Sequence, residues 1–147
     1  MNKVDVNMDN INEYTFDVIK IGMTEKFEVT ITNKMMNSFK LMTGDINPLH
    51  CNREYAISKG YSDRVVYGML TSSFYSTLVG VYLPGKHCLL HSVESKLVKP
   101  VYIGDTLNIT GTVKEKHDVF KRITIKSIIR NQNSEIVSKA KIILETK

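Results

Sequence analysis

The chain is poor in the residues that mark specialised small proteins, with two cysteines, three prolines and no tryptophan among 147 residues. Cys51 and Cys88 form no Cys-x-x-Cys motif, which excludes a disulfide scaffold and favours reduced thiols in a cytoplasmic protein. The low glycine and proline content excludes a collagen-like chain or a disordered linker. With 42% hydrophobic residues, we expect one domain over residues 1–147, with residues 1–20 as a loose or edge segment.

Several motifs of known chemistry are also missing. The sequence contains no Gly-x-Gly-x-x-Gly, no phosphate-binding P-loop and no Gly-x-Ser-x-Gly elbow, so the nucleotide and hydrolase chemistries that depend on them are not expected. Met1–Ile21 has no apolar stretch, and no secretory signal is expected. His87, Cys88 and His91 resemble a metal-binding spacing, but on a strand Cys88 would point away from both histidines, so we expect no metal and no other cofactor.

Positive charge is unevenly distributed along the chain. Residues 86–147 hold 12 Lys and Arg against 6 Asp and Glu, whereas residues 1–85 hold 8 against 9. The excess favours an anionic partner such as a phosphorylated ligand or an acidic carrier protein. No basic block or aromatic-interleaved RNA motif is present, so nucleic acid is not expected as a partner.

The first half of the chain predicts a strand followed by short helices. Lys26–Thr32 alternates apolar and polar residues, which is typical of a half-buried strand. Asn33 is expected to cap a short helix that ends at Gly44. Asn52 is expected to cap a second short helix that ends at Gly60.

An uncharged stretch of 19 residues, Val65–Leu83, follows. As a helix it would be about 27 Å long, and because it is apolar all round it should be buried on most sides. The length would also suffice for a membrane span. Its serine and threonine hydroxyls and the amphipathic strands around it argue against that interpretation, so no membrane span is expected.

The second half of the chain alternates with a period of two, which predicts antiparallel strands. The four segments are 87–99, 107–113, 123–129 and 136–144, joined by turns at 104–105, 115–121 and 131–134. One sheet that wraps the uncharged helix gives an α+β architecture. The helix is short of cover on one side, so we expect a homodimer whose sheets join edge to edge.

Asp45 and His50 lie five residues apart in a loop that Pro48 stiffens. A carboxylate beside an imidazole supplies a proton acceptor and a potential donor near neutral pH, which suits addition or removal of water. From the spacing alone, the structural interpretation is favoured, with Asp45 capping the turn and His50 at the surface.

Gly68 lies near the start of the uncharged helix, between Tyr67 and Met69. Backbone N–H groups in the first helical turn have no partner within the helix, and a glycine lets a ligand carbonyl approach closely. Taken alone, close packing of the helix on the sheet explains this glycine better. Tyr67 and Met69 are candidates for the substrate pocket.

The segment Phe39-x-x-x-Thr43-Gly-Asp-Ile-Asn-Pro-Leu-His50 resembles the signature of the MaoC-like dehydratases, specifically the (R)-specific enoyl-CoA hydratases. The similarity extends in order from about Phe27 to Val113. Its further matches are Tyr55-Ala56, Arg64–Leu70, Leu83–Gly85 and Lys99–Leu107.

The resemblance implies the hotdog fold, a curved antiparallel sheet around one long helix, in dimers or higher assemblies with the active site at the subunit interface. It implies reversible hydration of trans-2-enoyl-CoA, or of an acyl-carrier thioester, to the (R)-3-hydroxyacyl thioester without a cofactor. Asp45 and His50 would then be the acid/base pair that holds one water, and the Gly68 N–H would bind the thioester oxygen. Ser76 would support Asp45, and Asn47 would hold the loop.

One residue departs from the family pattern, because many members carry histidine where this chain has Tyr67. Two alternatives remain open. A hotdog thioesterase would resemble its relatives in placing Asp or Glu on the central helix, and Val65–Leu83 has neither. A non-catalytic subunit that binds acyl thioesters would keep the loop without turnover.

Overall fold

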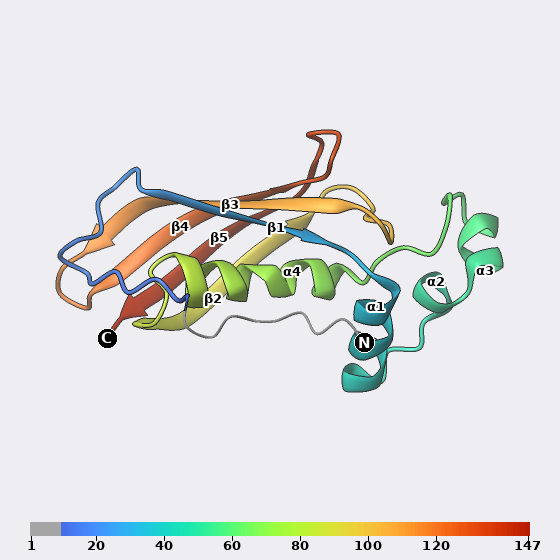
Figure 1. Ribbon diagram of the computed structural model, residues 1–147, viewed down its shortest axis with the longest axis horizontal. Coiled ribbons are helices and arrows are strands. Elements are labelled where there is room, and N and C mark those ends of the chain that lie inside the picture. The colour runs from blue at the N-terminus through green and yellow to red at the C-terminus, as the bar shows by residue number, and fades with distance from the viewer. Residues whose placement is uncertain (1–9) are drawn as a thin grey trace.

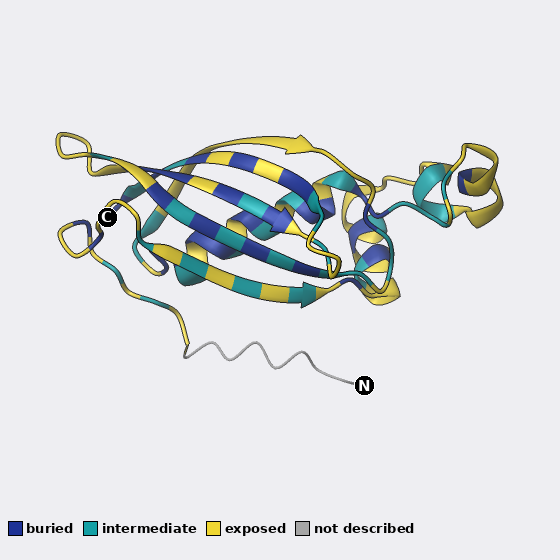
Figure 2. Ribbon diagram, turned by 90° about the horizontal axis from the view of Figure 1, so that it is seen from above, coloured by how far each residue is buried: buried dark blue, intermediate teal, exposed yellow. Residues whose placement is uncertain are grey.

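The structure is a computed structural model that describes residues 10–147. Its five strands form one antiparallel sheet in the order β1-β3-β4-β5-β2 (Figure 1). They are β1 (Thr24–Thr30), β2 (Cys88–Leu97), β3 (Thr106–His117), β4 (Arg122–Arg130) and β5 (Ile136–Thr146). Burial alternates along most of β3 and β5 (Figure 2), as the period of two predicts, whereas β2 is exposed beyond Cys88. β3 extends to His117, so the turn expected from residue 115 is shorter than predicted.

The inner face of the sheet packs against helix α4 (Gly68–Thr77) and the π-helical turn η1 (Leu78–Tyr82) (Figure 1). Leu70, Tyr75 and Leu78 are buried on that side. Gly111 of β3 permits the close approach, because a Cβ there would lie 2.6 Å from Leu78 Cδ2. The predicted α+β class and the hotdog arrangement are confirmed.

The boundaries of the central helix differ from the prediction, whereas its open side agrees with it. The helix begins at Gly68 rather than Val65, because the Val66 N–H donates to the Val101 carbonyl at 2.8 Å and Val65 forms a bridge with Tyr102. These two valines extend along the backbone of residues 101–102 before the helix starts. One side of the helix is open in the single chain, and Met69 on that side is 69% exposed.

Three short helices precede α4: α1 (Asn33–Thr43), α2 (Pro48–Cys51) and α3 (Arg53–Ser58). Thr32 caps α1 by accepting a hydrogen bond from the Met35 N–H at 3.2 Å, so the prediction of Asn33 as the cap was wrong. Gly44 ends α1 with φ of 73°, as expected. Asn52 caps α3, also as expected, although α3 ends at Ser58, before Gly60.

Residues 10–20 are attached to the fold. Phe16 and Ile19 are buried, and the Lys116 ammonium donates hydrogen bonds to both of their carbonyls. Of the two alternatives expected for this segment, loose or edge, the loose one does not describe residues 10–20, because two apolar side chains contribute to the core. The remainder of that expectation, residues 1–9, lies outside the described residues.

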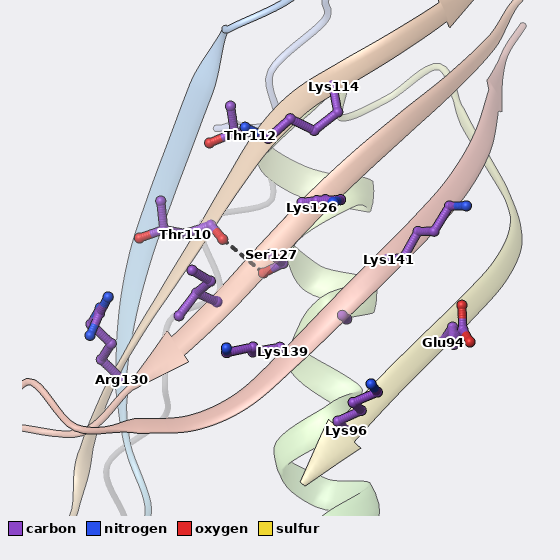
Figure 3. Close-up of a pocket in the computed structure, with 12 residues that line it drawn as sticks. Glu94, Lys96, Thr110, Thr112, Lys114, Lys126, Ser127, Arg130, Lys139 and Lys141 are labelled. Carbon is purple, nitrogen blue, oxygen red and sulfur yellow. Dashed lines mark hydrogen bonds between the residues drawn. The ribbon is translucent and has the colours of Figure 1, made fainter. Parts of the chain in front are cut away.

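The outer face of the sheet, opposite α4, carries a cluster of basic side chains (Figure 3). A hollow of about 680 Å³ on this face is lined by one acidic residue, Glu94, and six basic ones. The six are Lys96, Lys114, Lys126, Arg130, Lys139 and Lys141. The strand register sets Lys126 opposite Lys141 and Lys96 opposite Lys139, pairings that cost some sheet stability. Within residues 10–147, no helix has both the length and the apolarity to cross a membrane.

Candidate active site

Short-range hydrogen bonds set the shape of the loop between α1 and α2. The Asp45 N–H donates to Thr43 Oγ1 at 3.3 Å, and Asp45 Oδ1 accepts from the Asn47 N–H at 3.1 Å. Asn47 Oδ1 in turn accepts from the Leu49 N–H at 2.9 Å, which caps α2, and Pro48 occupies the first position of that helix. Asn47 therefore holds the loop, and Asp45 makes the turn contact that the structural interpretation anticipated.

Asp45 also keeps an oxygen available for chemistry. Its Oδ1 caps the turn, whereas its Oδ2 has no hydrogen-bond partner within residues 10–147. A carboxylate oxygen that is not engaged by the backbone can accept a proton or bind a water molecule. Capping and proton transfer are therefore compatible roles for one side chain.

His50 is fixed in one tautomer by its backbone contact. Its Nδ1 lies 2.6 Å from the Val65 carbonyl oxygen. A carbonyl only accepts hydrogen bonds, so Nδ1 must carry the hydrogen. In the neutral imidazole the lone pair is then on Nε2, which gives His50 the form of a general base.

Tyr67 contacts both Asp45 and His50. Its hydroxyl donates to the backbone carbonyl of Asp45 at 2.6 Å and lies 3.5 Å from Cys51 Sγ. Its ring packs on the His50 ring with centroids 4.2 Å apart. Burial, followed by the contact with Cys51, raises the pKa of Tyr67 well above its ordinary value of 10.0, so the hydroxyl remains a donor. Tyr67 therefore positions the loop and the imidazole together.

Gly68 is the first residue of α4, where backbone N–H groups have no acceptor within the helix. A Cβ at this position would clash with the side chain of Leu97 from β2. Close packing, which the sequence favoured as an explanation, is therefore present. This packing contact does not involve the Gly68 N–H, so Gly68 can both pack on the sheet and donate a hydrogen bond to a ligand.

One cavity of about 740 Å³ brings most of the predicted site residues together. Asp45, His50, Tyr67, Gly68, Met69 and Ser76 all line it. Asn47 does not line it. Ser76 reaches the cavity from α4 but makes no hydrogen bond with Asp45 within the described part of the chain.

Part of the cavity wall comes from β2, which sequence reasoning did not assign to the site. Leu90, Val93 and Leu97 line the cavity from this strand. Their apolar character was visible in the sequence, but the β-bulge between Leu90 and Ser92 changes which residues share a face. A second cavity of about 380 Å³ shares His50, Gly68 and Leu97 with the first. No cluster of three or more His, Cys, Asp or Glu among residues 10–147 is suited to a metal ion.

The sequence pattern of the MaoC like domain matches residues 18–134. The chain belongs to the MaoC-like dehydratase family. This MaoC-like chain is 32% identical over 123 residues to an (R)-specific enoyl-CoA hydratase of Rhodospirillum rubrum, covering 81% of this chain and 85% of the relative. It is 29% identical over 100 residues to a 3-hydroxybutyryl-CoA dehydratase of Methylorubrum extorquens, covering 68% of this chain and 64% of that relative.

A solved structure shares the fold of this MaoC-like chain. The unliganded R-hydratase from Pseudomonas aeruginosa superposes with a TM-score of 0.87 at 22% identity, covering 92% of this chain and 87% of that one. At this identity the similarity establishes the fold. The arrangement of a carboxylate, an imidazole lone pair and a helix N–H around one cavity is suited to holding water beside a polarised carbonyl compound.

Proposed function

We propose that this MaoC-like protein adds water to trans-2-enoyl-CoA to give (R)-3-hydroxyacyl-CoA, and catalyses the reverse dehydration. The observation that carries the proposal is the shared cavity, which Asp45, His50 and Gly68 at the first turn of α4 all line. Relatives with hydratase and dehydratase names support it. An acyl-carrier thioester would present the same reacting group.

The chemistry begins with polarisation of the thioester. A double bond conjugated to a thioester carbonyl is electrophilic at C3, and a hydrogen bond from the Gly68 N–H to the carbonyl oxygen increases that character. A single donor of this type contributes about 3 kcal/mol to stabilisation of the developing enolate. The substrate is thus already activated, which is why we propose a reaction that needs no metal or other cofactor.

Water then adds to the activated double bond. Asp45 and His50 hold the water so that its oxygen forms the new bond to C3. The pair accepts one proton from this water and returns one proton to C2, and it ends in the protonation state in which it began. Since both groups lie on one side of the substrate, the hydroxyl and the proton add to the same face. Ser76 would support the Asp45 carboxylate, and Tyr67 and Met69 would form part of the pocket wall.

We further propose that residues 1–147 act as one domain in a cytoplasmic homodimer. β2 is an edge strand with exposed apolar side chains, including Leu89 at 45% and Val93 at 38%, and an edge of this kind favours pairing with another strand. Pairing of β2 with β2 of the second chain would also place part of that chain near Met69, on the open side of α4. Light scattering at micromolar concentration should give twice the chain mass of 16.7 kDa. A single-chain mass would contradict the dimer.

The activity is tested by incubating the purified protein with trans-2-enoyl-CoA esters of several lengths. We expect the absorbance of the conjugated thioester to fall without release of free thiol. Thiol release without hydration would instead indicate a thioesterase. Binding of the thioester with neither change would indicate a non-catalytic subunit, and either result would overturn the proposal.

A further inference from the structure

The two cavities at the candidate site meet at the groups proposed to react. The larger, of about 740 Å³, and the smaller, of about 380 Å³, share only His50, Gly68 and Leu97 among their lining residues. His50 and Gly68 have roles in the proposed reaction. Leu97 has none, although it occupies the same junction.

Leu97 points towards α4 because of its position on β2. Glu94 and Lys96 lie on the outer face of the sheet (Figure 3), and successive side chains of a strand point to opposite faces. Ser95 and Leu97 therefore face the helix, and Ser95 Oγ lies 3.3 Å from Ser72 Oγ of α4. Leu97 ends the strand at the first turn of that helix.

The contact with Gly68 places Leu97 beside the proposed thioester position. Its Cδ1 methyl occupies the space that a Cβ on Gly68 would fill. A carbonyl oxygen bound by the Gly68 N–H puts the thioester carbon, and C2 next to it, close to this methyl. Further apolar side chains, including Val66 and Val137, line the smaller cavity beyond it. With the thioester in this proposed position, a substituent on C2 would meet the side chain of Leu97.

We propose that Leu97 determines specificity at C2, by excluding thioesters that carry a methyl branch on that carbon. The inference rests on the proposed function for the placement of the thioester. In this proposal Leu97 affects which substrate is accepted and takes no part in the chemical step. One methylene group in an apolar pocket changes discrimination by roughly 10- to 200-fold, so removal of this side chain should have a measurable effect.

The test compares Leu97→Ala with the wild-type protein on two substrates of equal chain length, trans-2-butenoyl-CoA and trans-2-methyl-2-butenoyl-CoA. We expect the wild type to prefer the unbranched substrate and the variant to reduce that preference, measured as the ratio of kcat/KM values, by roughly tenfold or more. Leu97→Val should give an intermediate ratio. Leu41→Ala is the matched control, since Leu41 of α1 is 83% exposed, lines neither cavity, and should leave the ratio unchanged.

Calorimetric binding of unreactive thioesters separates failure of this inference from failure of the proposed function. Butyryl-CoA and 2-methylbutanoyl-CoA differ by the same branch at C2 and need no turnover. If the two Kd values are closer to each other in Leu97→Ala than in the wild type, the inference is supported even if hydration is not observed. Unchanged ratios in Leu97→Ala, for both binding and turnover, would overturn it while leaving a measured hydratase activity intact. Leu97 is 56% exposed, so its truncation should have little effect on folding.

Discussion

Asp45→Asn and His50→Ala are each expected to lower kcat for hydration by roughly 100-fold or more. The Asn side chain retains an oxygen that can accept the hydrogen bond from the Asn47 N–H, which lies 3.1 Å from Asp45 Oδ1, so the loop should keep its shape while the carboxylate is lost. His50→Ala removes the Nε2 lone pair. Initial rates with trans-2-butenoyl-CoA, alongside thermal melting of each variant, provide the measurement.

The double variant and a neighbouring aspartate give the controls for this pair. Because the two groups act on one water, the double variant should be little slower than the worse single variant. Asp63→Asn removes the same charge from an exposed ion pair with Arg53 outside the cavity, and it should retain wild-type turnover. If Asp45→Asn and His50→Ala also retained wild-type rates, the pair would have no catalytic role.

Tyr67→Phe is expected to lower kcat by roughly 10- to 100-fold with little change in KM, because small displacements of reacting groups have effects of this size. The substitution removes the hydrogen bond, 2.6 Å long, that joins the Tyr67 hydroxyl to the backbone of Asp45. The phenyl ring remains to pack on His50. Rates measured as a function of substrate concentration separate kcat from KM.

The pH profile distinguishes positioning by Tyr67 from proton transfer. Burial raises the pKa of Tyr67 above 10.0, so the hydroxyl is fully protonated in the folded protein below about pH 10. Its contribution to stability is complete in that range and declines only as the pH rises through the raised folded-state pKa. Tyr67→Phe should therefore lower kcat by the same factor at every pH from about 6 to 9. If the fall in kcat at low pH or at high pH disappeared in Tyr67→Phe, proton transfer would instead be assigned to Tyr67.

Tyr75→Phe is the matched control, because it also removes a buried tyrosine hydroxyl. The Tyr75 hydroxyl lies 2.6 Å from Ser138 Oγ in the core, away from the cavity, and burial raises its pKa to about 12. We expect Tyr75→Phe to lower stability by about 1 kcal/mol without a selective fall in kcat. An equal loss of kcat in both variants would mean that Tyr67 acts only through stability.

Local patterns predicted most of the fold; one error occurs where distant segments meet and another lies between two neighbouring residues. Alternation along β3 to β5 gave the strands because each side chain faces either the core or solvent. The start of α4 was placed three residues early because the hydrogen bond from Val66 to Val101 joins positions far apart in the sequence. Thr32 and Asn33 are both competent caps, and their order alone does not decide between them.

The same distinction applies to the site. Asp45, Asn47 and His50 belong to one local loop, and the resemblance to a family motif was sufficient to single them out. The link from Tyr67 to Asp45 and the contact of Leu97 with Gly68 depend on separations of 22 and 29 residues. No local pattern contains such contacts, so they become visible only when the chain is folded.

The configuration of the product formed in deuterated water tests the proposed reaction most directly. Because Asp45 and His50 are proposed to act on one water, we expect trans-2-butenoyl-CoA to give the (R)-3-hydroxy thioester with deuterium at C2 on the same face as the new hydroxyl. NMR of the isolated product reports both centres. Addition to opposite faces, or an (S)-hydroxyl group, would contradict delivery of water and proton by this pair.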